Sequence, residues 1–373
     1  MNGTLIGTAL VAALALAAYV VLSPPYSNPD YNPAKPHHRP DGFANRHAGR
    51  LPKPDIWRWY YERLRDGLPK PPTRPIPSVK PDAALLKANR TQTTVTWLGH
   101  ATLLLQIDGL NILTDPHWGE RASPFSFIGP KRHQAVGIAL ADLPPIHAVL
   151  ISHNHWDHLE EASIRQLLRE HAATIRFYVP LGVQHWMQEH IPGAIIAGDG
   201  QNVFALDWDD ALHLAGQTAP VELRFLSVQP WSGRWLHDRY RTLWGSWAVL
   251  HPDFRFWFSG DIGYSKDTQE IGQKHGPFDL AAISIGAYAP RWFMKSAHLD
   301  PAEAIKVMRE IGAKSAFGIH WGSFDGISDE SLDQPPQDLE QELARIPGTR
   351  PNFFLLGNGQ TWESPIAATK KGN

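Results

Sequence analysis

A stretch of six residues in this 373-residue chain could bind metal, since it reads H-x-H-x-D-H: His153, Asn154, His155, Trp156, Asp157 and His158. Imidazole nitrogens and carboxylate oxygens are common zinc ligands, and the chain offers no thiolate because it has no cysteine. The motif follows an apolar run with strand character. A turn leaving that strand can direct His153 and His155 to one metal, and Asp157 and His158 to a second. A surface cluster of histidines is the alternative, but so many ligand-type residues directly after an apolar strand favour a metal site.

Two further ligand-type residues stand where predicted strands end. Asp261 follows an apolar strand through the dipeptide Ser-Gly, and His320 closes another apolar run. An aspartate in a turn is usually only a turn former, so neither residue is specific by itself. Taken with the H-x-H-x-D-H turn, they complete a set for two metal ions.

Most elements that must position these residues are predicted strands. Asp108-Gly109 reads as the turn of a hairpin, and Asp300, Pro301 and Glu303 form a box-like helix start. Strands, then a helix, then strands again, with ligands at strand ends, predict an α/β fold of two sheets sandwiched between helices. The predicted strands cover residues 94–98, 102–107, 110–113, 176–179, 221–228, 246–250, 255–259 and 314–319, and the predicted helices cover 160–171 and 300–311.

Composition describes a folded protein without an electrostatic preference for nucleic acid. Apolar residues make up 43% and charged residues 19% of the chain, and the net charge is −2. With a pI near 6.8, nucleic acid is not an expected partner. The absence of cysteine excludes a disulfide framework.

The first 22 residues are predicted to be a membrane anchor or a signal-like segment. The run from Leu5 to Leu22 carries no charge and is just long enough to cross a bilayer as a helix. No lysine or arginine precedes it, which favours an uncleaved anchor over a signal peptide. Basic residues follow only after the run, and they predict a membrane-associated protein on the cytoplasmic face: Lys35, Arg39, Arg46 and Arg50.

Residues 23–90 are predicted to be a Pro-rich extension that packs on a main domain at 91–373. Proline at this density prevents regular structure across most of the extension. The patch 55–65 is helical in character, and its aromatic residues suit either a membrane interface or packing on the main domain.

Several motifs together resemble one family. They are residues 97–102 (Trp-Leu-Gly-His-Ala-Thr), 115–118 (Asp-Pro-His-Trp), 151–158, 243–247 (Leu-Trp-Gly-Ser-Trp), 259–264 (Ser-Gly-Asp-Ile-Gly-Tyr), 285–294 (Ile-Gly-Ala-Tyr-Ala-Pro-Arg-Trp-Phe-Met) and 319–322 (Ile-His-Trp-Gly). This pattern is similar to the metallo-β-lactamase superfamily, in its branch of phospholipases D that hydrolyse N-acyl-phosphatidylethanolamine. The resemblance extends into the extension at 35–38 and 42–45.

The resemblance implies a four-layer αβ/βα metallo-β-lactamase sandwich. The predicted fold is thus α/β, with this sandwich as the hydrolase domain at 91–373, preceded by the N-terminal apolar helix and the Pro-rich extension. It implies two zinc ions, the first on His153 and His155 and the second on Asp157, His158 and His320, with Asp261 as the bridge. Asp157 and Asp261 would also be catalytic. His298 matches a family histidine near the scissile phosphate, where it could transfer a proton or bind phosphate; the alternative is a residue that only satisfies backbone groups before a helix.

One position departs from the family pattern. The family has a further histidine ligand for the first metal, and Pro230 stands in its place. Three arrangements remain open: a weakened site for two metals, an enzyme that uses only the second metal, or substitution by His237. His100 and His117 are candidates for groups that hold the ligands in place.

The function that the resemblance implies is a membrane-associated zinc phosphodiesterase acting on a phospholipid. Metal-bound hydroxide would attack phosphorus in N-acyl-phosphatidylethanolamine and release phosphatidic acid and an N-acylethanolamine. The alternatives are a lactonase or soluble phosphodiesterase of the same fold, and a non-catalytic metal- or lipid-binding protein. The sequence does not distinguish zinc from iron or manganese, and it leaves the oligomeric state open, a homodimer included.

Overall fold

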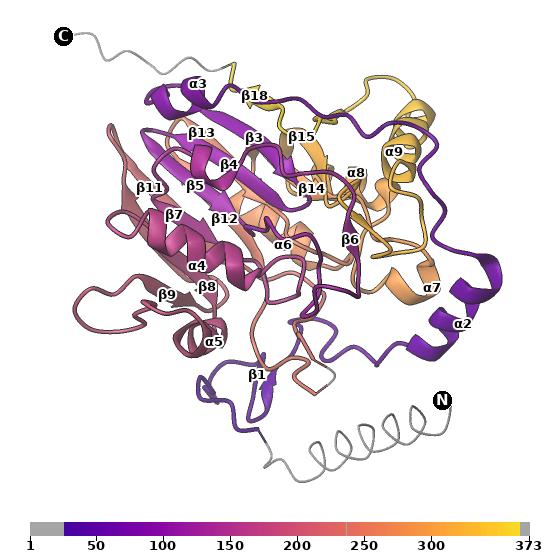
Figure 1. Cartoon of the computed structure of the whole chain (residues 1–373), viewed down its shortest axis with the longest axis horizontal. Coiled ribbons are helices and arrows are strands. Elements are labelled where there is room, and N and C mark those ends of the chain that lie inside the picture. The colour runs from indigo at the N-terminus through magenta and orange to yellow at the C-terminus, as the bar shows by residue number, and fades with distance from the viewer. Residues whose placement is uncertain (1–25, 236, 366–373) are drawn as a thin grey trace.

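Two seven-stranded sheets form the centre of the molecule in the computed structural model, which describes residues 26–235 and 237–365 (Figure 1). In spatial order the first sheet contains β18 (Thr361–Glu363), β3 (Thr94–Gly99), β4 (Thr102–Ile107), β5 (Leu110–Thr114), β7 (Ala148–Leu150), β8 (Arg176–Pro180) and β9 (Val203–Leu206). The second contains β10 (Ala211–Ala215), β11 (Pro220–Leu226), β12 (Ser246–His251), β13 (Phe254–Phe258), β14 (Phe278–Ser284), β15 (Ala313–Ile319) and β17 (Asn352–Phe354).

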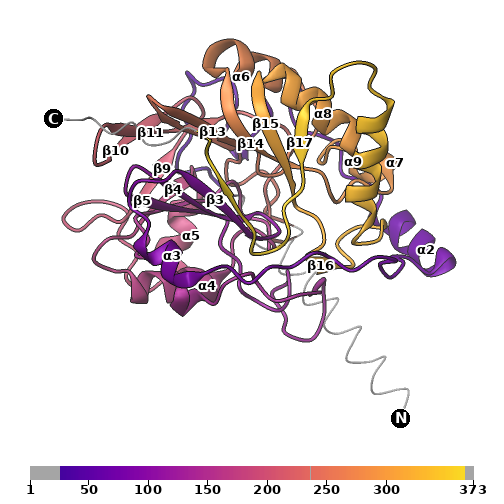
Figure 2. The same cartoon turned by 90° about the horizontal axis from the view of Figure 1, so that it is seen from above.

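Helices cover the outer face of each sheet, as the view from above shows (Figure 2). The first sheet carries α3 (Ala83–Ala88), α4 (Glu161–Glu170) and α5 (Val183–His190), and the second carries α6 (Asp267–His275), α8 (Pro301–Glu310) and α9 (Gln334–Arg345). The predicted αβ/βα metallo-β-lactamase sandwich is therefore confirmed. The smaller elements are η1 (Leu140–Asp142), α7 (Arg291–Met294) and the two-stranded pair of β6 (Lys131–Arg132) and β16 (Phe324–Asp325).

The strands are apolar on both faces because both faces are buried. In β4, Leu103 and Leu105 point between the sheets, whereas Leu104 packs under the outer helices. A strand buried on both sides cannot alternate apolar and polar residues, which explains the continuous apolar runs in the sequence.

Local signals in the sequence match the observed turns and caps. Asp108 and Gly109 join β4 to β5, both with positive φ, as a tight hairpin requires. The Asp300 side chain accepts a hydrogen bond from the backbone N–H of Glu303, and the Glu303 side chain accepts one from the backbone N–H of Asp300. Helix α8 therefore begins with the predicted capping box.

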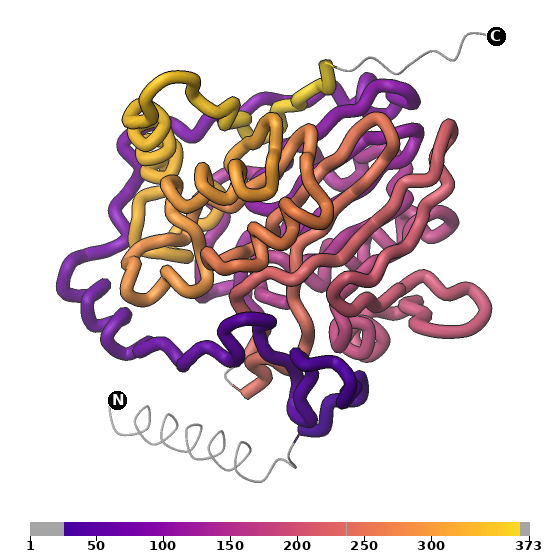
Figure 3. The backbone as a smooth tube through the Cα atoms, turned by 180° about the vertical axis from the view of Figure 1, so that it is seen from behind, coloured from indigo at the N-terminus to yellow at the C-terminus, as the bar shows by residue number. Residues whose placement is uncertain are grey.

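The extension runs around the outside of the sandwich (Figure 3). It contains β1 (His38–Arg39), β2 (Gly42–Phe43) and α2 (Ile56–Asp66). In α2, Trp59 stacks on Phe293 with ring centroids 4.8 Å apart, and its Nε1 donates to Asp329 at 2.9 Å. One aromatic residue of the predicted helical patch therefore packs on the main domain.

A buried polar cluster joins the extension to the turn after β9. His37 Nε2 lies 2.6 Å from Asp207 Oδ1, and His38 Nε2 lies 3.0 Å from Asp207 Oδ2. The His37 ring also stacks on Trp208 at 4.4 Å between centroids. Each histidine nitrogen that faces Asp207 has a hydrogen-bond partner, so the cluster is satisfied without an ion and its role is to hold the extension in place.

The described part of the structure contradicts the predicted location at a membrane through a spanning helix. Within residues 26–235 and 237–365, no helix is long and apolar enough to cross a bilayer. The predicted anchor at 1–22 lies outside the residues that the structure describes.

Asp207→Asn should destabilise the protein by about 3 kcal/mol, because it leaves buried imidazole groups without their carboxylate. Burial opposes ionisation of Asp207, but hydrogen bonds, led by that from His37, hold its pKa well below the usual value. Its contribution is therefore present above about pH 4 and lost as the pH falls further. Thermal unfolding between pH 3 and 7 measures this, with exposed Asp199→Asn as the control. Equal acid sensitivity in both variants would contradict the role of the cluster.

Candidate metal centre

The candidate ligands come from three segments that meet at one edge of the sandwich. His153, His155, Asp157 and His158 lie on the turn after β7, Asp261 follows β13 and His320 follows β15. The turn at Asp261 approaches the first sheet closely, since a Cβ on Gly260 would come within 2.7 Å of Ser152 Cβ. Gly260 also has φ +58°, so glycine suits this position for two reasons.

Four ligand atoms form what we call the second set: Asp157 Oδ2, His158 Nε2, Asp261 Oδ1 and His320 Nε2. His158 Nε2 lies 3.3 Å from Asp157 Oδ2 and 3.3 Å from Asp261 Oδ1. His320 Nε2 lies 3.3 Å from the first of these oxygens, 3.0 Å from the second and 3.2 Å from His158 Nε2. A tetrahedral zinc ion with bonds of 2.0–2.1 Å spaces its ligand atoms about 3.3 Å apart. The second set therefore has the dimensions of a zinc site.

Three atoms form the first set: His153 Nε2, His155 Nδ1 and Asp261 Oδ2. His153 Nε2 lies 2.8 Å from His155 Nδ1 and 3.6 Å from Asp261 Oδ2. The two carboxylate oxygens of Asp261 thus face different sets, which is the arrangement of a bridging ligand. Asp261 Oδ1 is buried and makes no hydrogen bond to any described residue. A buried carboxylate oxygen without a hydrogen-bond partner is consistent with a ligand to a metal ion.

The charges of the site call for a cation. Burial alone would raise the pKa values of Asp157 and Asp261, but the surrounding histidines, His158 foremost, bring both well below the usual value. Burial opposes protonation of His158 in turn, yet the same two carboxylates raise its pKa well above the usual value. The imidazoles therefore offset the charge of the two buried carboxylates only in part, and a divalent ion would compensate it more completely.

The first-set histidines are prepared as neutral ligands. Burial, with the neighbouring His158, lowers the pKa of His153 well below its usual value, and burial lowers the pKa of His155 to about 4. A neutral imidazole keeps the lone pair that binds metal.

A single buried carboxylate, Asp115, orients histidines of both sets. Its Oδ2 accepts from His158 Nδ1 at 2.8 Å and from the Ser152 hydroxyl at 2.5 Å. Ser152 Oγ in turn lies 2.8 Å from His153 Nδ1, so Nδ1 is the donor and Nε2 is left free. Such contacts fix the tautomer and direction of metal-binding histidines. The sequence analysis included Asp115 in the motif 115–118 but did not predict that it orients the ligands, although it ends a strand in the same way as Asp261.

The other sequence candidates occupy different positions. His298 Nδ1 is buried, has no hydrogen-bond partner in the described part of the chain and lies 3.9 Å from Asp261 Oδ2. His100 Nε2 lies 2.8 Å from Asp157 Oδ2 and so contacts a candidate ligand. His117 Nδ1 accepts a hydrogen bond from Arg132 at 2.9 Å, and among the described residues His117 is outside the candidate ligand groups. Pro230 is buried, and His237 is exposed and outside the candidate ligand groups.

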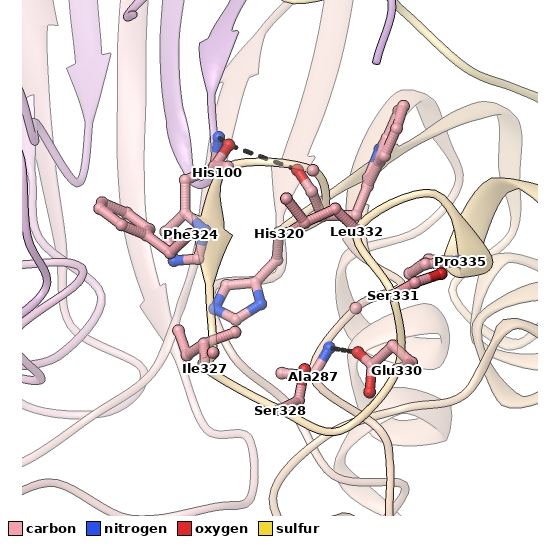
Figure 4. A pocket seen from close by; sticks show the side chains of 15 residues that line it. His100, Ala287, His320, Phe324, Ile327, Ser328, Glu330, Ser331, Leu332 and Pro335 are labelled. Carbon is pink, nitrogen blue, oxygen red and sulfur yellow. Dashed lines mark hydrogen bonds between the residues drawn. The ribbon is translucent and has the colours of Figure 1, made fainter. Parts of the chain in front are cut away.

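A small pocket beside His320 is lined in part by Gly286 and Ala287, which begin the segment 286–290 (Figure 4). Glu330 accepts hydrogen bonds from the backbone N–H groups of Ala287 at 2.6 Å, Tyr288 at 3.3 Å and Ala289 at 2.9 Å. These bonds fix Ala287 in a left-handed conformation with φ 62°. The segment leads into α7 and on to His298, so Glu330 helps to define this wall of the site.

Comparison with known proteins agrees with this geometry. The sequence pattern described as β-lactamase superfamily domain matches residues 110–321, which include every candidate ligand. The chain belongs to the metallo-β-lactamase superfamily. It is 39% identical over 272 residues to N-acyl-phosphatidylethanolamine-hydrolyzing phospholipase D 1 of Caenorhabditis elegans, covering 72% of this chain and 75% of that protein.

One further relative and one solved structure are similar to this chain, the latter in fold alone. A mitochondrial N-acyl-phosphatidylethanolamine-hydrolyzing phospholipase D of Saccharomyces cerevisiae is 31% identical over 71% of this chain, which spans 55% of that relative. A metallo hydrolase from Ignicoccus hospitalis shares the fold with a TM-score of 0.53 at 16% identity, covering 74% of this chain and 100% of that one. The metallo-β-lactamase fold and the named relatives identify the chain as a metal-dependent hydrolase.

Asp115→Asn should lower affinity for divalent metal by about 10–100-fold, because an NH2 group would replace one of the two oxygens that accept hydrogen bonds from Ser152 and His158. Competition with a chromophoric chelator measures the affinity. Exposed Asp253→Asn is the matched control. If both variants bind metal as the unchanged protein does, Asp115 does not orient the ligands.

Proposed function

We propose that this hydrolase is a zinc-dependent phosphodiesterase of phospholipase D type. Its substrate would be N-acyl-phosphatidylethanolamine, and its products phosphatidic acid and an N-acylethanolamine. The observation that carries the proposal is Asp261, whose two oxygens face two ligand sets in a site dimensioned for zinc. The substrate is inferred from the names of the C. elegans and S. cerevisiae relatives.

The residues proposed to hold the metals are His153 and His155 for the first ion, and Asp157, His158 and His320 for the second, with Asp261 shared. When bound, a pair of such ions supplies water of lowered pKa and positive charge for the phosphoryl oxygens. In the balanced reaction, water adds to phosphorus, the bond to the headgroup oxygen breaks, and that oxygen receives a proton.

Asp157 and His298 have separate tasks in this proposal. His100 donates to Asp157 Oδ2 and so fixes the carboxylate that would orient the attacking water. Burial lowers the pKa of His298 to about 4, so its imidazole is neutral at pH 7. A neutral His298 could donate one N–H to a phosphoryl oxygen or relay a proton to the leaving group.

Metal-loaded protein should release phosphatidic acid and N-acylethanolamine from N-acyl-phosphatidylethanolamine in mixed micelles, as measured by mass spectrometry. In water enriched with oxygen-18, the label should enter phosphatidic acid, because attack is at phosphorus. Label in the N-acylethanolamine would contradict that bond cleavage. Turnover of soluble esters or lactones without any lipid product would overturn the substrate and favour another hydrolase of this fold.

Asp157→Asn should reduce kcat/KM by at least about 100-fold, since it removes a preorganised charge at the reacting centre. Exposed Asp142→Asn serves as the matched control and should keep full activity. Circular dichroism checks that both variants are folded. Activity that survives in the folded Asp157 variant would mean that this carboxylate is not part of the catalytic site.

Pro230→His should raise zinc affinity at the first set by at least about tenfold, because a fourth protein ligand completes a tetrahedron. Metal content per chain and chelator competition measure this. Pro230→Ala is the control for the loss of proline in a buried loop. Equal occupancy in the histidine and alanine variants would show that position 230 does not face the first metal.

A further inference from the structure

Asn154 and Trp156 are the two residues of the H-x-H-x-D-H turn that lie outside the ligand sets, and both contact the loop that carries Pro230. The Asn154 side-chain oxygen accepts from the backbone N–H of Gly233 at 2.7 Å. Trp156 Nε1 donates to the backbone oxygen of Arg234 at 2.6 Å. The turn is therefore bound on one side by the candidate metal ligands and on the other by residues 233 and 234.

Arg234 makes the most extensive of these contacts. Its Nη1 donates to the backbone oxygens of Asn154 at 3.0 Å and Leu159 at 2.7 Å, which flank His155, Asp157 and His158. The guanidinium carbon lies 3.7 Å from the centre of the Trp156 ring and 4.9 Å from that of Trp186. Carbonyl dipoles and aromatic faces thus surround a buried cation.

The guanidinium of Arg234 bonds to the backbone of this turn, and more distant carboxylates, Asp238 and Glu161 foremost, also attract its charge. Its side chain is buried, and no carboxylate of the described residues lies within ion-pair distance of its guanidinium. Its backbone N–H donates to Asp238 at 2.9 Å, which fixes the start of the following loop. A buried cation without a directly paired carboxylate is costly, and its bonds to two backbone carbonyls of the turn offset part of that cost.

The same loop reaches the other segments of the first set. Gln229 O accepts from the backbone N–H of Gly263, two residues after Asp261, at 2.9 Å. Gln229 Nε2 donates to the backbone oxygen of Ser296 at 2.7 Å, near His298. The Trp231 ring meets the His155 ring edge-on at 4.4 Å. Residues 229–234 therefore contact all the segments around the first set without donating a ligand.

We infer that Arg234 is a positioning residue that holds His155, which lies between Asn154 and Trp156, in place for the first metal, in a loop where Pro230 offers no ligand. A set with only three protein ligands depends strongly on their prior placement, because each ligand lost to disorder removes a larger share of the binding. The inference rests on the proposed metal binding, but not on the identity of the substrate.

Arg234→Lys tests this role while keeping the positive charge. Lysine cannot donate to both carbonyls in the planar geometry of a guanidinium, nor stack on two indole rings in the same way. Arg255→Lys is the matched control, because Arg255 also donates to two backbone oxygens, of Pro277 at 3.0 Å and His275 at 2.6 Å, at the far end of β13 from Asp261.

The readouts are cobalt(II) binding by chelator competition and the visible spectrum of the bound ions. Arg234→Lys should bind one ion as tightly as the unchanged protein and the other about 10–100-fold more weakly, with loss of its absorption bands. Arg255→Lys should bind both ions normally. If Arg234→Lys binds two ions with unchanged affinity and spectrum, the inference is wrong.

A second variant guards against a folding defect in Arg234→Lys. Trp156→Phe removes the indole N–H that bonds to Arg234 but keeps an aromatic face, and it should weaken the same ion to a smaller extent. Unchanged affinity in folded Trp156→Phe would likewise overturn the inference, as would failure of the unchanged protein to bind any metal. Protein that binds two ions but does not hydrolyse N-acyl-phosphatidylethanolamine would overturn only the proposed substrate.

Discussion

Two buried carboxylates, Asp157 and Asp261, set the constraint on which the site depends. Neither can be ionised in the interior without compensating positive charge, and the imidazoles around them provide it only in part. The distances of 3.0–3.3 Å between the atoms of the second set leave a space that fits a zinc ion. The strands that end at this edge therefore support an arrangement that a cation would stabilise.

The orientation of the histidine ligands depends on residues that do not themselves belong to the ligand sets. Asp115 fixes His158 directly and His153 through Ser152, so one carboxylate prepares members of both sets. Asp115 and Ser152 are fully buried, so the groups that orient the histidines belong to the core of the protein and not to a surface loop. The precision of the site thus derives from the packing of the sandwich.

The sequence predicted the parts of this arrangement that are local in the chain. The H-x-H-x-D-H turn, the strand ends at Asp261 and His320 and the capped start of α8 each depend on a few neighbouring residues. The roles of Asp115, Glu330 and Arg234 were not predicted, because their hydrogen-bond partners are distant in sequence. Arg234, for example, lies 80 positions from Asn154. Glycine, proline and capping residues indicate the local backbone conformation directly in the sequence. A buried hydrogen bond between distant segments can be identified only in the folded structure. The membrane span was inferred from composition alone, and the described helices contain no counterpart.

The two ligand sets differ in how they are held. The second set joins residues of both sheets, since His158 follows a strand of the first and His320 a strand of the second, so its dimensions are fixed when the sandwich forms. The first set has three protein atoms, two of them on a single turn, and its enclosing loop contributes contacts in place of a ligand. A site with fewer ligands leaves more of the ion open to other partners, which catalytic zinc sites require. Because Pro230 offers no side-chain ligand, placement of the first-set histidines depends on packing, and the buried guanidinium of Arg234 bonds to the turn that carries them.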